Sequence, residues 1–196
     1  MKKIAVFLDR DGNINEDVGY PNSYDKIKIY PYSFEAVRKI NHAGLLAVIV
    51  TNQSGIGRGL IEEKNLLDIH NKMKKEFELN NAHIDGVYFC PHFTSSPDPR
   101  YRADCDCAKP NPGMALKAAA DLNINLKGSY VVGDKVSDIA FGYNIQARPV
   151  LVLTGYGKDS LPQLQKTDMP PAHISQNLLE AVEWIIEQEN RRLSQK

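Results

Sequence analysis

The sequence predicts an α/β fold in which a doubly wound parallel sheet lies between two layers of helices. Two observations support this: short apolar runs alternate with longer amphipathic stretches, and conspicuous polar residues directly follow the apolar runs. Such alternation implies right-handed crossovers between parallel strands, with helices covering both faces of the sheet. The 196 residues, 42% of them hydrophobic, suffice for one full core, so we expect a single domain over residues 1–196.

Each element has a local signal. The first apolar run is continuous, which is typical of a strand buried on both faces. Ser33 and Gly44 bracket the first helix as N-cap and C-terminal glycine, and Pro112 stands at the first turn of another. The last helix carries its apolar residues, with Trp184, at helical spacing. The predicted strands are residues 4–8, 45–50, 87–90, 130–132 and 150–153. The predicted helices are residues 33–43, 62–79, 112–122, 137–145 and 177–191.

The composition narrows the class of protein. Formal net charge is zero, with 24 basic and 24 acidic residues, which argues against a dedicated nucleic-acid binder. No apolar run approaches the roughly 18 residues that a membrane-spanning helix needs. The apolar stretch after Lys2 and Lys3 ends at Leu8 and meets acidic residues, so it indicates a strand and no export signal. We therefore expect a cytoplasmic protein, and a monomer.

Polar residues gather where strands end. Asp9 and Asp11 follow the first strand, Thr51 the second and Asp134 the fourth, while Lys109 lies in a short Ala-Lys-Pro run. The carboxylate pair alone fits a polar turn equally well. Because ligands of such sheets bind beyond the carboxyl ends of the strands, we expect these groups to converge. A hydroxyl, an ammonium and three carboxylates together predict a site for phosphate and Mg²⁺.

A second cluster combines three thiols with one imidazole. Cys90 and His92 stand as Cys-x-His, and Cys105 and Cys107 as Cys-x-Cys. Three incidental cysteines beside a surface histidine are the alternative, but the set matches a closed four-coordinate Zn²⁺ site. We expect structural zinc in a loop over residues 90–107, ordering the polar stretch 93–104. Lys109 follows two residues later, so zinc would anchor the loop that carries it.

These motifs, in this order, resemble those of the haloacid dehalogenase superfamily of aspartate-nucleophile phosphatases, and the likeness covers nearly the whole chain. The superfamily pattern is Asp-x-Asp, then Thr or Ser, then Lys, then Gly-Asp-x-x-x-Asp. The matching positions here are Asp9 to Asp11, Thr51, Lys109, and Asp134 with Asp138. The resemblance implies a Rossmann-like fold and an aspartyl-phosphate intermediate.

The resemblance also implies a role for each position. Asp9 is the nucleophile, and Asp11 protonates the leaving oxygen and later activates water. Asp9, the backbone carbonyl of Asp11 and Asp134 hold Mg²⁺. Thr51 and Lys109 hold the phosphoryl oxygens. By the same resemblance, Asp138 orients Lys109 or a metal-bound water.

Zinc-loop members of the superfamily form two groups: the D-glycero-D-manno-heptose 1,7-bisphosphate phosphatases and the histidinol-phosphate phosphatases. The chain is similar to both in Asp-Arg-Asp-Gly (9–12), Thr-Asn-Gln-Ser-Gly (51–55), the cysteine motifs and Lys-Pro-x-Pro-Gly-Met (109–114). Twelve residues separate His92 from Cys105, a length that resembles the heptose group. No segment after Asp11 or Thr51 is long enough for a cap domain. The resemblance implies removal of the 7-phosphate of the heptose bisphosphate, on the route to ADP-heptose and surface polysaccharide.

The resemblance further implies a set of substrate contacts. The family usually has Arg where this chain has Ala108, which opens the question of substrate and anomer preference. Asn13 replaces a usual Thr and can still hydrogen-bond the turn. Arg58 fits a distal phosphate or a solvated surface charge equally well. The expected substrate-binding residues are Asp17, Val18, Gly19, Tyr20, Asn52, Gln53, Ser54, Ala108 and Lys135.

Three alternatives to the heptose phosphatase remain open from the sequence. A histidinol-phosphate phosphatase shares all the motifs quoted above. A polynucleotide phosphatase shares the Asp-x-Asp core, although the chain lacks a basic stripe. A zinc-stabilised binding module with a dead site would leave catalytic positions unfilled, whereas here all are filled. The remaining histidines are interpreted as surface or internally satisfied residues: His42, His70, His83 and His173.

Overall fold

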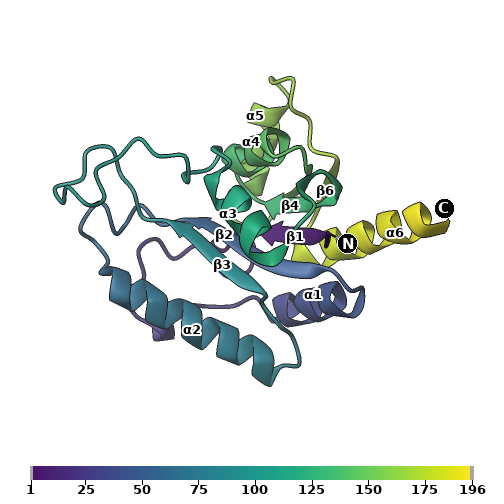
Figure 1. The fold of residues 1–196 in the computed structure, drawn as a ribbon, viewed down its shortest axis with the longest axis horizontal. Coiled ribbons are helices and arrows are strands. Elements are labelled where there is room, and N and C mark those ends of the chain that lie inside the picture. The colour runs from purple at the N-terminus through teal and green to yellow at the C-terminus, as the bar shows by residue number, and fades with distance from the viewer. Residues whose placement is uncertain (1, 195–196) are drawn as a thin grey trace.

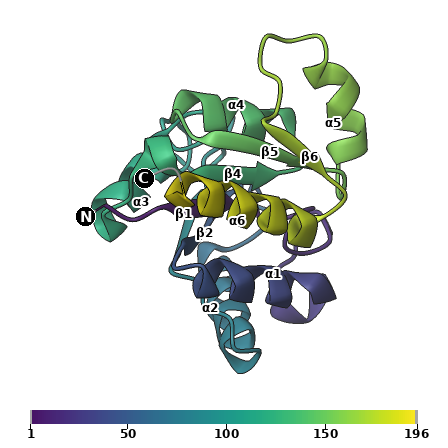
Figure 2. The same ribbon diagram turned by 90° about the vertical axis from the view of Figure 1, so that its right-hand side faces the viewer.

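The computed structural model describes residues 2–194, so residues 1, 195 and 196 of the expected domain lie outside the described range. A six-stranded, all-parallel sheet lies between helical layers (Figures 1 and 2), which confirms the predicted fold class. The strand order is β3-β2-β1-β4-β5-β6. The strands are β1 (Ala5–Leu8), β2 (Leu46–Asn52), β3 (Gly86–Cys90), β4 (Tyr130–Gly133), β5 (Arg148–Val152) and β6 (His173–Ser175). The helices are α1 (Pro31–His42), α2 (Glu63–Leu79), α3 (Gly113–Leu122), α4 (Val136–Asn144), α5 (Gly157–Leu164) and α6 (Leu178–Ser194), with short 3₁₀ turns at Tyr24–Lys26 and Leu126–Gly128.

Both faces of the sheet are buried, as the side chains of β1 illustrate. Val6 and Leu8 pack into a cluster with α1, α2 and α6, whereas Ala5 and Phe7 pack into a second cluster with α3 and α4. All four side chains are fully buried. Because successive side chains of a strand point to opposite faces, only a continuous apolar run can supply both clusters.

The structure differs from the sequence prediction at three elements. Helix α1 begins at Pro31, and Ser33 is no N-cap: it is buried, and its hydroxyl donates to the carbonyl of Ile14 at 2.8 Å. Proline at the first helical position explains the earlier start, because its missing N–H has no partner there in any helix. Helix α5 and strand β6 were not predicted, because α5 contains Pro162 and β6 has only three residues.

Strands β2 and β3 are added on one side of β1, and β4, β5 and β6 on the other. The strand order therefore changes direction between β1 and β4, which are parallel neighbours although two strands separate them in sequence. At this point the backbone N–H of Asp9 donates to the carbonyl of Val132 at 3.0 Å. Asn13 joins the same two strand ends, because its amide donates to the carbonyls of Asp9 and Val132 at 3.1 and 3.2 Å. The segments after β1 and β2 are loops with short turns, so no cap domain interrupts the described residues. Among these residues, no helix combines the length and the apolar character that crossing a membrane requires.

Candidate active site

A buried lysine bridges two carboxylates at the carboxyl ends of the strands. The Nζ atom of Lys109 lies 2.7 Å from Asp9 Oδ1 and 2.6 Å from Asp138 Oδ1, and it donates to the Val50 carbonyl at 2.9 Å. The three charged side chains are only 3%, 6% and 1% exposed. Asp138 therefore contacts Lys109 directly, and the ammonium is held in place from both sides.

Burial, together with crowded negative charge, shifts the pKa values of this cluster. Burial raises the pKa of Asp9 to about 6, although Lys109 opposes the shift. Burial, with the charge of Asp9, raises the pKa of Asp134 to about 7. Burial alone would lower the pKa of Lys109, but Asp138 and Asp9 outweigh it and raise the pKa instead. Both carboxyl groups thus resist ionisation, and a bound cation would relieve that resistance.

The carboxylates fit a hard cation. One oxygen from each of Asp9, Asp134 and Asp138 lies within 4.8 Å of the others. Asp134 Oδ1 is buried and has no hydrogen-bond partner among the described residues, while its Oδ2 accepts the backbone N–H of Tyr156 at 2.7 Å. A buried carboxylate oxygen without a partner is costly unless something binds it. An all-oxygen donor set with one such orphan suits Mg²⁺.

The carboxylate of Asp11 is held by a fork of hydrogen bonds from the fully buried Arg10. Arg10 Nε donates to Oδ1 at 3.0 Å and an Arg10 terminal nitrogen to Oδ2 at 2.7 Å. Asn15 and Gln53 donate to the same two oxygens at 3.0 and 2.9 Å. Burial alone would raise the pKa of Asp11, but Arg10 outweighs it, so the pKa is lowered. The arrangement therefore favours the ionised form of Asp11.

Behind this fork lies His70, one of the four histidines interpreted as surface or satisfied residues. It is buried, and its Nε2 lies 3.0 Å from an Arg10 terminal nitrogen. Arginine has no acceptor, so the imidazole nitrogen accepts this hydrogen bond. Burial, with the charge of Arg10, lowers the pKa of His70 to about 3, so the ring is neutral. His70 is thus satisfied, and it supports the site from behind.

The end of β2 fixes the loop that carries Lys109. The side chain of Asn52 pairs with the Lys109 backbone in both directions: its Oδ1 accepts the N–H at 2.9 Å and its Nδ2 donates to the carbonyl at 3.1 Å. Thr51 is buried, and its hydroxyl oxygen accepts from Gln53 Nε2 at 2.9 Å. The residues at the end of this strand therefore lie beside both Asp11 and Lys109.

Two hollows with shared lining residues lie over these side chains. The inner pocket, of about 30 Å³, is lined by Asp9, Asp11, Thr51, Asn52, Lys109, Lys135, Ser137 and Asp138. The outer groove, of about 460 Å³, is lined by Asp11, Asp17, Gly19, Tyr20, Asn52, Gln53, Ser54, Lys135 and Tyr156. They share Asp11, Asn52 and Lys135. The inner pocket gathers the charged side chains that could bind a phosphoryl group, and the rest of a substrate would lie in the outer groove.

Most of the expected substrate contacts line the outer groove, but three positions differ. Val18 and Ala108 line neither hollow, and the methyl group of Ala108 packs against the cluster around α3. Tyr156 lines the groove, although no sequence motif singled it out. Its place just after β5 was the available signal, since ligands gather beyond the ends of such strands. A larger hollow of about 790 Å³ between α1 and α6 contains none of the expected site residues.

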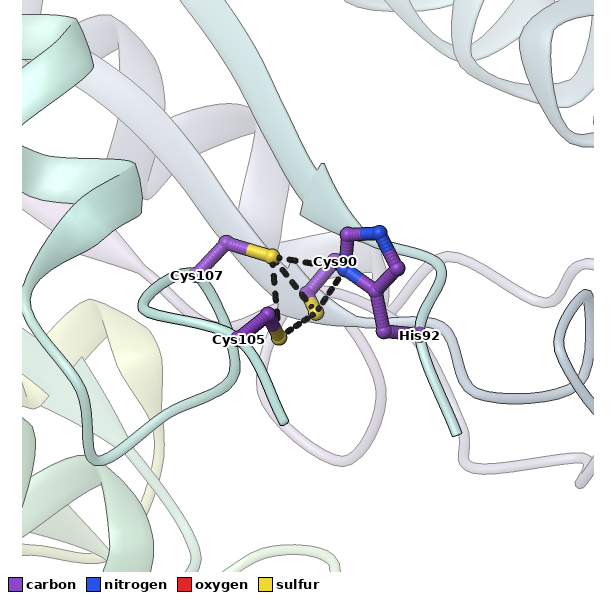
Figure 3. Close-up of side chains that lie close together, drawn as sticks. All are labelled: Cys90, His92, Cys105 and Cys107. Atoms are coloured by element: carbon purple, nitrogen blue, oxygen red, sulfur yellow. Dashed lines mark hydrogen bonds between the residues drawn. The ribbon is translucent and has the colours of Figure 1, made fainter. Parts of the chain in front are cut away.

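The three thiols and the imidazole converge on one point beside the end of β3 (Figure 3). The sulfur of Cys90 lies 3.3 Å from that of Cys105 and 2.8 Å from that of Cys107. His92 Nδ1 lies 3.1 Å from the Cys107 sulfur. All three cysteines are free, and the four ligand atoms lie within 4.8 Å of one another. A set of three sulfurs and one nitrogen can hold a structural Zn²⁺ ion.

The loop between His92 and Cys105 packs on the segment that follows β2. The Arg58 guanidinium lies 3.8 Å above the centre of the Phe93 ring, so Arg58 stacks on this loop and does not line the outer groove. Tyr101 donates to Glu63 Oε2 at 2.7 Å. The backbone N–H of Gly57 donates to the Pro91 carbonyl at 2.9 Å. The loop between the two halves of the cysteine cluster thus packs on the segment after β2 and on the start of α2.

Comparison with known proteins identifies the class of protein to which this fold and site belong. Residues 106–181, which include Lys109 and Asp134, match the HAD-hydrolase-like family model. A solved D,D-heptose 1,7-bisphosphate phosphatase from B. bronchiseptica, complexed with magnesium and phosphate, superimposes with a TM-score of 0.81. That structure is 32% identical and covers 96% of this chain and 99% of its own. The protein is a haloacid dehalogenase-like hydrolase.

Curated relatives narrow the class to one family. The D-glycero-β-D-manno-heptose-1,7-bisphosphate 7-phosphatase of Pasteurella multocida (strain Pm70) is 44% identical over 156 residues, which cover 79% of this chain and 84% of the relative. The enzyme of the same name from Escherichia coli (strain K12) is 40% identical over 153 residues, covering 77% and 80%. The chain belongs to the D-glycero-β-D-manno-heptose-1,7-bisphosphate 7-phosphatase family.

Proposed function

We propose that the protein is a magnesium-dependent phosphatase that removes the 7-phosphate of D-glycero-D-manno-heptose 1,7-bisphosphate. The observation that carries this proposal is the inner pocket, where Lys109 bridges Asp9 and Asp138 beside the unpartnered oxygen of Asp134. The names of the relatives supply the substrate. The product would supply ADP-heptose for surface polysaccharide.

Asp9 is the proposed nucleophile. Its carboxylate attacks phosphorus, and the bond from phosphorus to the sugar oxygen breaks as the bond to Asp9 forms. Lys109 and the Thr51 hydroxyl hold the phosphoryl oxygens as their charge redistributes. Asp9, Asp134 and the backbone carbonyl of Asp11 would hold Mg²⁺, which offsets the repulsion between the carboxylate and the phosphate dianion.

Asp11 is the proposed proton carrier. It would give a proton to the departing sugar oxygen and then take one from the water that hydrolyses the aspartyl-phosphate. The Arg10 fork lowers the pKa of Asp11 and so favours the carboxylate. That form suits the second proton transfer directly, whereas the first requires Asp11 to be protonated beforehand. Arg10 therefore suits Asp11 as a base more than as an acid.

A structural Zn²⁺ ion held by Cys90, His92, Cys105 and Cys107 is the second proposed metal. The support is the convergence of four suitable donors around one point. The Cys90 and Pro91 carbonyls accept backbone N–H groups of Gln53 and Gly57 at 2.7 and 2.9 Å. The ion would thereby anchor the segment after β2 as well as the loop that carries Lys109.

The test is phosphate release from a substrate panel with Mg²⁺, including both anomers of the heptose bisphosphate and histidinol phosphate. We expect the highest kcat/KM for a heptose anomer and no turnover in Asp9→Asn. The exposed Asp121→Asn, on α3, is the matched control that should retain full activity. A kcat/KM more than about tenfold higher for histidinol phosphate would overturn the proposed substrate assignment. Full activity of Asp9→Asn would overturn the mechanism.

We further propose a single phosphatase domain over residues 1–196 that acts on a phosphorylated sugar in the cytoplasm, as a monomer and without nucleic acid. The zero net charge supports the last point. Size-exclusion chromatography with light scattering should give about 22 kDa, the mass of one chain. Binding of single-stranded DNA at low salt would instead favour the polynucleotide alternative.

A further inference from the structure

Two tyrosines line the outer groove, and one of them, Tyr156, has no role in the proposed chemistry. Tyr20 and Tyr156 both line the groove, and their exposed fractions are 49% and 51%. The Lys135 ammonium lies 5.0 Å from the centre of the Tyr156 ring, within the range of a cation–π contact. Tyr156 is therefore half exposed, and its ring lies beside a lysine that also lines the inner pocket.

The backbone around Tyr156 is fixed. Its N–H donates to Asp134 Oδ2 at 2.7 Å, and the Thr154 hydroxyl donates to the Gly12 carbonyl at 2.6 Å. Gly155 has φ +50°, and a Cβ there would lie 2.2 Å from Asp134 Oδ2, so only glycine fits at that position. The backbone position of Tyr156, shortly after β5, is thus set by contacts that also involve Asp134.

The groove offers little positive charge to the remote part of a substrate. Lys135 is the one basic residue among the described residues that line it, and Asp17 pairs with it at 3.2 Å. Ala108 packs against the cluster around α3, and Arg58 stacks on Phe93 outside the groove. Apart from Lys135, the groups in the groove that can recognise the remote part of a substrate are the polar groups of residues 52–54, Asp17 and the aromatic faces. Such a groove is suited to a sugar, because polar groups can bind the hydroxyls of a sugar ring and an aromatic side chain can pack against the C–H face of that ring.

We propose that Tyr156 is a specificity-determining residue whose ring packs against the sugar of the substrate. This inference rests on the proposed function only in requiring a sugar phosphate in the outer groove. The ring, held by Lys135 and the fixed backbone, is preorganised, so its contact with the sugar costs little ordering.

The test compares Tyr156→Ala and Tyr156→Phe with the wild type on the preferred sugar phosphate and on methyl phosphate, which has no sugar to pack. We expect Tyr156→Ala to raise KM for the sugar phosphate about fivefold to tenfold, with kcat within about twofold and methyl phosphate kinetics unchanged. Tyr156→Phe should retain the wild-type KM, because the ring makes the contact. Tyr143→Ala, at a 40% exposed tyrosine on α4 that does not line the groove, is the matched control.

Three results would overturn the inference: an unchanged KM for the sugar phosphate in Tyr156→Ala, an equal rise for methyl phosphate, or a Tyr156→Phe variant as impaired as Tyr156→Ala. The failure of the proposed function looks different. If the wild type prefers another sugar phosphate of the panel to the heptose bisphosphate, the heptose assignment falls, and Tyr156 is tested on that sugar. If methyl phosphate is used as well as every sugar phosphate, the role of Tyr156 falls too.

Discussion

Replacing Lys109 by methionine should destabilise the protein severely in the absence of magnesium. The ammonium is the partner of Asp9 and Asp138 at 2.7 and 2.6 Å, and all three side chains are almost fully buried. Methionine fills a similar volume without the charge. The variant would therefore leave two carboxylates buried at short range with no cation between them.

The expected loss follows from that burial. Removing one partner of a buried ion pair costs about 3–5 kcal/mol, because the remaining charge is left uncompensated. For a chain of this length the loss corresponds to a fall in Tm of about 10 °C. The exposed pair Lys117–Asp121, at 3.1 Å on α3, provides a matched control, since its side chains are 68% and 45% exposed. Lys117→Met should cost less than about 1 kcal/mol.

The loss should depend on pH. The pKa of Asp9 is about 6 in the folded protein, above its ordinary value of 3.8, so the fold is more stable when Asp9 is protonated and loses stability as pH rises through about 6. Lys109 lowers that pKa, so its removal raises the pKa further. The loss of unfolding free energy in Lys109→Met, relative to the wild type, should therefore be largest at pH 8 and smaller at pH 5.

The assay is urea unfolding at pH 8 and pH 5 without added magnesium, with wild type, Lys109→Met and Lys117→Met measured side by side. Lys109→Met should unfold at much lower urea than Lys117→Met at pH 8, and the gap should narrow at pH 5. A Lys109→Met protein within about 1 kcal/mol of the wild type at pH 8 would refute the reasoning. So would a deficit that grows toward pH 5.

Three further predictions concern the metals and the turn after β1. Apparent magnesium affinity, measured by calorimetry, should fall about tenfold per pH unit below about 7, because protons compete for Asp134 and then Asp9; a flat profile from pH 8 to 5 would contradict this. Cys107→Ser should lose the expected one zinc per chain and expose residues 93–104 to proteolysis, whereas retained zinc would argue against the four-ligand site. Gly12→Ala should cost at least about 3 kcal/mol in chemical unfolding, because its φ is +86° and a Cβ would lie 2.3 Å from Asp134 Oδ2. Gly19→Ala, at φ +76° with open space around it, should cost about 1 kcal/mol, and equal losses would exclude the close contact as the cause.

The fold could be predicted from the sequence because its signals are local. A strand buried on both faces must be apolar throughout, and residues 4–8 and 45–50 have no other pattern. The short β6 and the proline-containing α5 escaped prediction, because three residues carry no period and Pro162 argues against a helix. Ser33 was misplaced because its hydroxyl serves a tertiary contact with Ile14.

The sequence by itself determined which chemical groups the site would contain. Asp9 and Asp11, like Cys105 and Cys107, are neighbours along the chain, and strands in a parallel sheet deliver their following residues to one edge. That rule brings Thr51 and Asp134 toward Asp9, whereas Lys109 follows no strand and was predicted at the site from its motif. The motif order then indicated the family.

Only the tertiary structure decided which groups touch. Arg10 contacts His70, which lies 60 residues away in the chain, and this histidine supports Asp11 through Arg10. Tyr156 lines the groove and its N–H binds Asp134, whereas Ala108 packs against the cluster around α3 and does not line the groove. Such contacts depend on strand order and on side-chain direction. Both are properties of the packed sheet, and no local pattern in the chain encodes them.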